Sequence, residues 1–253
     1  MCFFCQVLFA YDEQKSILEF VYGGALPPVQ ERQEKSIECQ IMDWADDTAY
    51  CLHDIIDGIR AGFISPLKLE RWGEKVLGKD GSWNGVSMEQ VLKNLIESIL
   101  ADNIEWSFSK KIGDFIHACA LEPRSEPSHL RELTQRYHFD LAIEPKILAE
   151  CELYKKITAD LIFTSTALQC YEFKGSHLLD ELFKAIYDHY IVREDGLKIL
   201  PESTSEGILQ GNPSADEKIR RICDFLANLT DRQAIQAYKR LYHPDFGSLT
   251  DLS

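Results

Sequence analysis

The stretch SIECQIMDWADDTAYCLHDIIDGIRA, residues 36–61, decides the fold class of this chain. Its apolar positions recur every three or four residues, which is the spacing of one face of an α-helix. These positions are Ile37, Ile41, Trp44, Ala45, Thr48, Leu52, Ile55 and Ile59. Gly62 follows soon after the basic Arg60, as is common where a helix ends. The pattern therefore predicts one long helix that ends at Gly62.

Helical periodicity continues through most of the chain on both sides of this segment. The pattern predicts further helices at residues 11–22, 66–77, 88–100, 107–121, 128–137, 145–169, 175–190, 215–228 and 231–242. Residues 78–87 and 196–213 contain several glycines or prolines, so we expect loops there. Because alternation of apolar and polar residues is almost absent, we expect an all-α protein, a multi-helix bundle.

Serine and threonine residues stand where several of these helices should begin. Ser87, Ser214 and Thr230 are each followed three residues later by Glu or Gln, which is the spacing of a capping box. Ser176 is a further candidate for a helix cap. These caps predict the starts of four helices.

The composition excludes several classes of protein. Of 253 residues, 45% are apolar and 27% are charged, which is typical of soluble globular chains rather than disordered ones. No apolar run is long enough to span a membrane. The 41 acidic residues against 27 basic ones give a net charge of −14. General binding to nucleic acid or to an anionic membrane is therefore not expected.

The eight cysteines are spread at wide intervals, apart from Cys2 and Cys5. Scattered cysteines in apolar helical patterns are typical of reduced thiols, so we expect a cytoplasmic protein. Cys2 and Cys5 have the spacing of half a zinc site, but no second pair follows, and we do not expect a structural zinc. The apolar start MCFFCQVLFA has no basic region before it, so we expect no secretory signal.

Three polar side chains form a stripe on the long predicted helix. Asp46, Tyr50 and Asp54 are spaced four residues apart, which places them on one face over two turns. Two carboxylates on one face repel each other unless solvent, a cation or hydrogen-bond donors lie between them. A divalent metal or a sugar hydroxyl would serve, but the spacing alone favours a solvated acidic face. Apolar neighbours around the stripe favour the functional interpretation, since buried carboxylates need partners.

Two separated segments resemble a known enzyme family. QIMDWADDTAYCLHDIIDGIRAGFIS, residues 40–65, resembles the segment with the motif ADDxAYxxxDxxDxIxxG in bacterial deoxyguanosinetriphosphate triphosphohydrolases (dGTPases) and related dNTP triphosphohydrolases. These enzymes belong to the HD-domain phosphohydrolase superfamily. RRICDFLANLTDRQAIQAYKRLY, residues 220–242, resembles their C-terminal signature. Further stretches fit between these two, so the resemblance covers residues 11–243.

The resemblance implies that this chain is the C-terminal part of an HD-domain phosphohydrolase fold. Residues 1–121 would be the C-terminal part of the helical HD core, including the ADDTAY helix. Residues 122–253 would be the phosphohydrolase-associated region. We expect the two parts to pack as one unit.

The resemblance also assigns roles to the stripe. Asp46 would be the last ligand of a divalent metal such as Mn²⁺ or Mg²⁺. Tyr50 would pack against the nucleotide sugar, and Asp54 would contact the deoxyribose 3′-hydroxyl. The complete enzyme would hydrolyse a dNTP such as dGTP to the deoxynucleoside and tripolyphosphate, with a metal-activated water as the nucleophile.

The family's other metal ligands have no counterpart in this sequence. They are an early His and a His-Asp pair, in a signature like HDxGHxPFGH, and the catalytic acid and base lie in the same region. The dipeptide His53-Asp54 matches the sugar-contact position instead. We therefore expect no catalytic residue in this chain and no activity when it is alone. The apolar start favours a gene truncated or restarted internally, with a degenerate relative and a fragment as alternatives.

Two functions remain open. The chain is either the C-terminal part of a dGTPase-like enzyme, or a non-catalytic nucleotide-binding or oligomerisation module derived from that family. We expect it to associate with an HD-bearing chain or with copies of itself. Arg220, Arg221 and Arg232 are candidates to face phosphate or a neighbouring subunit. Membrane and nucleic-acid partners are not expected.

Overall fold

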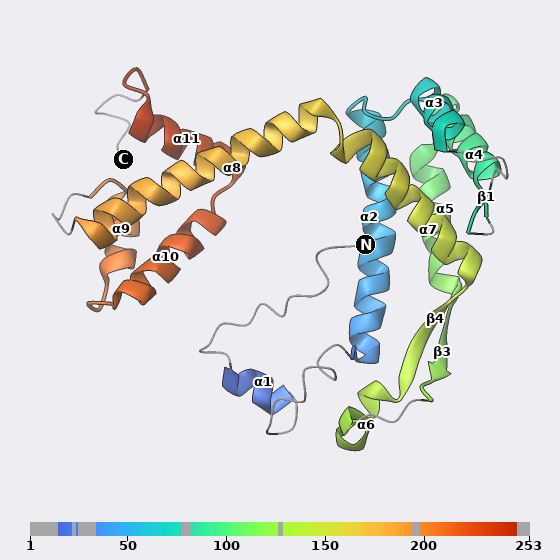
Figure 1. The fold of residues 1–253 in the computed structure, drawn as a ribbon, viewed down its shortest axis with the longest axis horizontal. Coiled ribbons are helices and arrows are strands. Elements are labelled where there is room, and N and C mark those ends of the chain that lie inside the picture. The colour runs from blue at the N-terminus through green and yellow to red at the C-terminus, as the bar shows by residue number, and fades with distance from the viewer. Residues whose placement is uncertain are drawn as a thin grey trace. The chain divides into compact units, whose positions relative to one another are not determined.

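A computed structural model describes residues 15–21, 24, 34–76, 82–84, 86–125, 129–193 and 198–246 (Figure 1). The chain divides into two compact units, Met1–Ser165 and Thr166–Ser253, and each is described by itself. The predictions for Cys2 and Cys5 lie outside the described residues. The predicted division at residue 121 stays a prediction.

The first unit is built from helices and two short antiparallel hairpins. Its helices are α1 Lys15–Val21, α2 Ile37–Arg60, α3 Pro66–Val76, α4 Met88–Leu100, α5 Ile104–His117, α6 His129–Leu133 and α7 Pro145–Thr158. A 3₁₀ turn at Gln135–Tyr137 follows α6, and a π-helical turn at Ala159–Phe163 follows α7. Strands β1 (Ser82–Trp83) and β2 (Val86–Ser87) form one hairpin, and β3 (Cys119–Pro123) and β4 (Phe139–Ile143) form the other.

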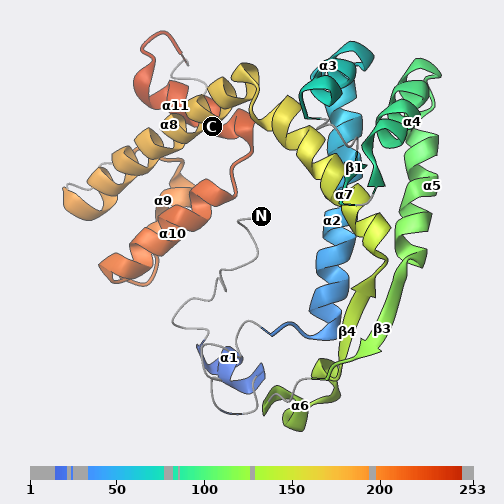
Figure 2. The same ribbon diagram turned by 45° about the vertical axis from the view of Figure 1, so that its right-hand side comes forward.

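The long predicted helix is confirmed as α2. Ser36 caps its start by accepting a hydrogen bond from the backbone N–H of Cys39. Gly62 follows its end at φ +76°, a left-handed conformation that glycine adopts without strain. The buried side of α2 packs against α7 and α5, with Leu52 and Ile55 fully buried. In Figures 1 and 2, α2 runs beside α7 in both views.

The β3–β4 hairpin corrects the predicted helix at residues 107–121. That helix ends at His117, and the chain continues at once into β3. Figure 2 shows β3 leaving the end of α5 and β4 leading into α7. Leu121 lies opposite Leu141 in the register, and the partner strand is too distant in the sequence for local periodicity to detect. The expected loop at residues 78–87 likewise contains β1 and β2, with Asn84 at φ 46° in the turn.

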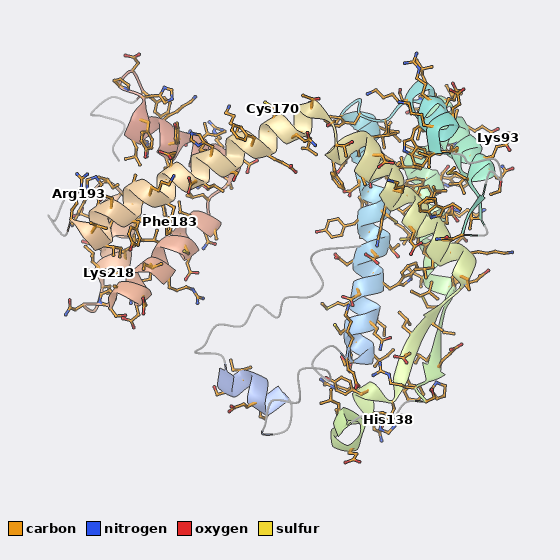
Figure 3. All side chains as sticks on the ribbon, viewed as in Figure 1. Lys93, His138, Cys170, Phe183, Arg193 and Lys218 are labelled. Carbon is orange, nitrogen blue, oxygen red and sulfur yellow. The ribbon has the colours of Figure 1, made fainter. Side chains whose placement is uncertain are left out.

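The second unit contains α8 Thr166–Tyr187, α9 Glu202–Leu209, α10 Ala215–Ala227 and α11 Asp231–Tyr242. A π-helical turn at Asp188–Val192 extends α8. Helices α10 and α11 both pack against α8, and α9 packs against α10. One apolar cluster holds Ile186, Tyr190, Ile208 and Ile222, with Phe183 packed beside it (Figure 3).

Two helix starts in this unit are confirmed and two predictions are wrong. Ser214 and Thr230 each form a full capping box. Ser176 lies inside α8 rather than at a cap, because the chain breaks earlier, at residues 164–165, after the π-helical turn. Helix α9 occupies part of the expected loop at 196–213, directly after Pro201.

The all-α class is confirmed, since β-structure in the described residues is limited to the two short hairpins. None of the helices in the described ranges has both the length and the apolar character that a membrane span requires.

Candidate functional site

The predicted stripe lies on the face of α2 opposite the core. Trp44, Cys51 and Ile55 point into the first unit and are buried. Asp46 is exposed and Tyr50 is 60% exposed. Asp54 is half-buried. The structure therefore leaves the stripe open to solvent along α2, rather than enclosed by apolar neighbours as the sequence suggested.

The acidic residues around the stripe have cationic partners. The Asp43 carboxylate lies 2.5 Å from Lys35 Nζ, and the Asp47 carboxylate lies 2.5 Å from Lys155 Nζ. Asp57 lies 3.8 Å from Arg60. Three of the five aspartates of α2 are therefore partly neutralised within the first unit.

The two acids of the stripe differ from these neighbours. The side chains of Asp46 and Asp54 form no hydrogen bond or ion pair with any residue that the structure describes. Their carboxylate oxygens are free to accept hydrogen bonds or to ligate a cation, both of which carboxylates do well. Tyr50 stands between them in the sequence and presents an exposed aromatic ring. The stripe thus offers two acceptors and an apolar surface on one face.

Asp54 has a raised pKa. Burial is the larger cause, because it disfavours the charged form, and the neighbouring Asp57 adds repulsion. His53 acts in the opposite direction and lowers the pKa of Asp54. Because burial and repulsion disfavour the ionised form of Asp54, a hydroxyl or cation that approaches this carboxylate stabilises it.

The described residues hold no group of three or more His, Cys, Asp or Glu side chains that could bind a metal ion. The His138 ring lies 3.0 Å from the backbone carbonyl of Arg131, and His53 borders a groove on α2. Asp46 is therefore not part of a metal site with three such side chains from these residues.

Two of the three candidate arginines have structural partners within the second unit. Arg220 donates to the Asp224 carboxylate one turn along α10 at 3.0 Å. Arg221 donates to the backbone carbonyls of Gly207 and Ile208, which lie in α9, and of Gln210, which follows it. Arg232 is exposed in the first turn of α11. Arg221 therefore connects α10 with α9 through its Nη1 group.

Sequence reasoning missed the contacts that hold α2 to α7. The thiols of Cys51 and Cys151 lie 3.5 Å apart in the core. Cys51 directly follows Tyr50 in the sequence. Lys155, one turn along α7, reaches Asp47. Both contacts join residues about a hundred positions apart, so no local pattern in the sequence signals them. They fix the orientation of the stripe relative to the core.

Comparison with known proteins gives one family model and many related proteins. Residues 141–240 match the phosphohydrolase-associated domain. The chain is 25% identical over 208 residues to a deoxyguanosinetriphosphate triphosphohydrolase-like protein of Haemophilus influenzae (strain PittEE), which covers 82% of this chain and 42% of that protein. It is 27% identical over 212 residues to a protein of the same description from Vibrio cholerae serotype O1, covering 82% and 45%. A third such protein, from Shewanella loihica, is 25% identical over 221 residues, covering 86% and 47%. The chain spans less than half the length of these relatives.

Proposed function

We propose that this chain supplies part of the nucleotide site of a dNTP triphosphohydrolase. The proposal rests on its relationship to the dGTPase-like HD-domain phosphohydrolases, whose C-terminal portion it resembles. The complete enzyme would hydrolyse a dNTP, dGTP among them, to the deoxynucleoside and tripolyphosphate. The proposal places the protein in the cytoplasm, in nucleotide metabolism.

The observation that carries the proposal is the pair of unpartnered carboxylates on α2. Among the described residues, the flanking aspartates have cationic partners, while Asp46 and Asp54 have none. In the proposal, Asp46 ligates a divalent cation such as Mn²⁺ or Mg²⁺. Tyr50 packs its ring on the deoxyribose, and Asp54 accepts a hydrogen bond from the 3′-hydroxyl.

The described residues do not complete a metal site. A single carboxylate binds a divalent cation weakly; catalytic zinc sites, for comparison, use three protein ligands. The proposal therefore requires ligands from an HD-bearing polypeptide. It follows that the chain alone should not hydrolyse dNTPs.

The test measures deoxyguanosine and tripolyphosphate released from dGTP in the presence of Mn²⁺. The chain is assayed alone, and then together with a second polypeptide that carries the HDxGH signature. We expect product only in the mixture. Rapid dGTP hydrolysis by the purified chain alone would contradict this division of the site.

Variants separate the roles of the three stripe residues. Asp46→Asn should abolish the activity of the mixture, because a neutral amide is a poor substitute for a metal-bound carboxylate. Asp54→Asn should mainly raise KM for dGTP, by roughly two- to tenfold for one hydrogen bond. Asp57→Asn is the matched control, an exposed acid on the same helix outside the stripe. Equal effects of all three variants would show that only the charge of α2 matters.

The second candidate is a non-catalytic nucleotide-binding or oligomerisation module. It is favoured by the finding that no set of three metal-ligating side chains gathers within the described residues. Calorimetry with dGTP and Mn²⁺, combined with sedimentation, distinguishes the two. A stable oligomer that binds nucleotide but stays inactive with every HD-bearing partner supports this second function.

A further inference from the structure

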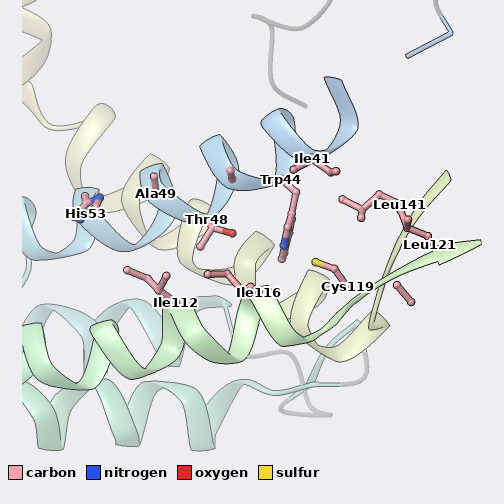
Figure 4. A pocket seen from close by; sticks show the side chains of 12 residues that line it. Ile41, Trp44, Thr48, Ala49, His53, Ile112, Ile116, Cys119, Leu121 and Leu141 are labelled. Atoms are coloured by element: carbon pink, nitrogen blue, oxygen red, sulfur yellow. The ribbon is translucent and has the colours of Figure 1, made fainter. Parts of the chain in front are cut away.

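A groove lies in the first unit between α2, α5 and the β3–β4 hairpin. Its volume is about 460 Å³, which is within the range of small-molecule sites. Figure 4 shows side chains of α2 and α5 facing one another across it. Its lining includes Trp44, Thr48, Ile112, Ile116, Leu121 and Leu141.

The walls of this groove are held in place by contacts within the unit. The Trp44 ring stacks on Phe115 of α5 with ring centroids 5.7 Å apart. The Trp44 indole N–H also donates to the backbone carbonyl of Phe115 at 3.2 Å. Strand β3 follows α5 directly and pairs with β4, so Leu121 and Leu141 approach from one side. The groove is therefore formed before any ligand binds, which lowers the entropic cost of binding.

One polar atom in the groove has no hydrogen-bond partner. Thr48 is only 5% exposed, and its hydroxyl makes no hydrogen bond with any residue that the structure describes. A buried hydroxyl without a partner is costly and uncommon in folded proteins. Thr48 lines the groove, so a polar group of a ligand bound there can pair with this hydroxyl.

The lining also limits the charge of a ligand. It contains no Lys, Arg, Asp or Glu, and its titratable side chains are His53 at one end and the Cys119 thiol. A carboxylate or phosphate would be buried without a cation near it, which is unfavourable. A nucleobase presents several polar edges, and these apolar walls would leave most of them unpaired.

We propose that this groove binds a neutral small molecule with an aromatic or branched aliphatic body and a single hydroxyl or carbonyl group, which pairs with the Thr48 hydroxyl. The apolar body contacts the isoleucine and leucine side chains of α5 and the hairpin. The site is distinct from the acidic stripe, since Asp46, Tyr50 and Asp54 do not line the groove. It therefore stands whether or not the proposed nucleotide site is correct.

The test uses two probes that differ by one hydroxyl group. Equilibrium dialysis of the purified full chain measures the Kd of 2-naphthol and of naphthalene. We expect naphthol to bind more tightly by roughly two- to tenfold, the range of one hydrogen bond. Naphthoate, which adds a negative charge to the same ring system, should bind more weakly than either.

A conservative variant assigns that difference to Thr48. Thr48→Val keeps the branched shape and removes the hydroxyl, so naphthol should bind about as weakly as naphthalene. Ala49→Phe adds a ring at the groove wall and should abolish binding of both probes. Ala167→Phe, an exposed position on α8 of the second unit, is the matched control and should leave both Kd values unchanged.

Three results would overturn the proposal. The first is no binding of naphthol to the wild-type chain. The second is an unchanged preference for naphthol in Thr48→Val. The third is unchanged binding in Ala49→Phe, with the native fold verified by circular dichroism, which would place the probes elsewhere.

Discussion

Asp46 and Asp54 share a face of α2 but differ in their electrostatic surroundings. Asp46 is exposed, whereas Asp54 is half-buried beside Asp57 and has a raised pKa. With a raised pKa, the folded state holds the Asp54 proton more tightly than the unfolded chain does. Stability therefore falls as pH rises from the unfolded value, about 3.9, through the folded one, and stays lower above it.

Asp54→Asn removes this unfavourable charge. At pH 7 we expect the free energy of unfolding to rise by up to roughly 0.5 kcal/mol, because the position is only partly buried. The gain should shrink as pH falls and disappear below about 3, where Asp54 is protonated in both states. Urea unfolding at the two pH values measures it. Asp46→Asn is the control and should change little; a less stable Asp54→Asn protein at pH 7 would contradict the assignment.

Residue spacing was sufficient to predict the stripe but not its surroundings. Four-residue spacing placed Asp46, Tyr50 and Asp54 on one face, and the structure puts them on the open side of α2. It could not show that Lys155, on a helix far along the chain, neutralises Asp47. The contrast between paired and unpaired acids depends on contacts between helices that are distant in the sequence. The assignment of metal and sugar contacts remains a prediction.

Gly58 in α2 is packed closely against side chains that follow it in the sequence. A Cβ atom added there would lie 2.5 Å from Ile162 Cδ1 and 3.0 Å from Ile64 Cδ1. Alanine normally improves an internal helix position by about 0.5–1 kcal/mol. At Gly58, the added methyl must displace two buried side chains, and overpacking of this kind costs about 1–3 kcal/mol.

We therefore expect Gly58→Ala to lower the free energy of unfolding and Gly113→Ala to raise it. Gly113 lies inside α5, and a Cβ there meets no atom within 4 Å. The pair of variants makes the same chemical change in two helices, so helix propensity cancels from the comparison. Urea unfolding of both proteins measures the difference. Equal stabilisation by the two changes would show that the Gly58 contact is not restrictive.

The hairpin is attached to the start of α2 by Arg124. This side chain is 14% exposed and donates to the carboxylates of Asp140 and Glu34. It also donates to the backbone carbonyl of Lys35, just before α2. The hydrogen bonds from Arg124 are the main reason that the pKa of Asp140 is lowered. A lowered pKa contributes stability above the unfolded value of about 3.9, and this contribution is lost as pH falls through the folded pKa.

Arg124→Ala should destabilise the protein by about 1–3 kcal/mol at pH 7, because the charged hydrogen bonds to Asp140 and to Glu34 are lost. The difference from wild type should begin to shrink below about pH 4, where the unfolded chain takes up a proton at Asp140, and should be lost once pH falls through the lowered folded pKa. Arg220→Ala is the control and should cost less than about 0.5 kcal/mol, because its exposed pair with Asp224 lies within one helix. If the loss of unfolding free energy in Arg124→Ala did not change with pH, the effect would come from lost packing rather than from the charged hydrogen bonds.

Element types were predictable where the signal is local, and less so elsewhere. Capping boxes at Ser214 and Thr230 marked two helices correctly. Strands β3 and β4 escaped notice because each is stabilised by a partner distant in the sequence, and five residues give little alternation to recognise. The break between α7 and α8 falls at a π-helical turn without glycine or proline, so no breaker residue marks it.

Charge acts on the molecule as a whole. A net charge of −14 opposes any compact state through repulsion among like charges. Salt screens this repulsion, and the screening length falls from about 30 Å at 0.01 M to about 8 Å at 0.15 M ionic strength. Salt also weakens exposed ion pairs, such as that of Lys184 with Asp180, but those contribute little. The repulsion should therefore dominate the response.

We expect Tm to rise as NaCl is increased from 0.01 to 0.15 M, and then to level off because the repulsion is already screened. Differential scanning calorimetry at constant pH measures this change. NaCl and KCl should act alike, since the effect depends on ionic strength and not on a bound ion, whereas a specific cation site would favour one salt. A variant with three exposed acids of the second unit neutralised, Glu172→Gln, Asp216→Asn and Glu206→Gln, should show a smaller rise. A Tm that falls with salt would mean that attractive ion pairs outweigh the net repulsion of this acidic chain.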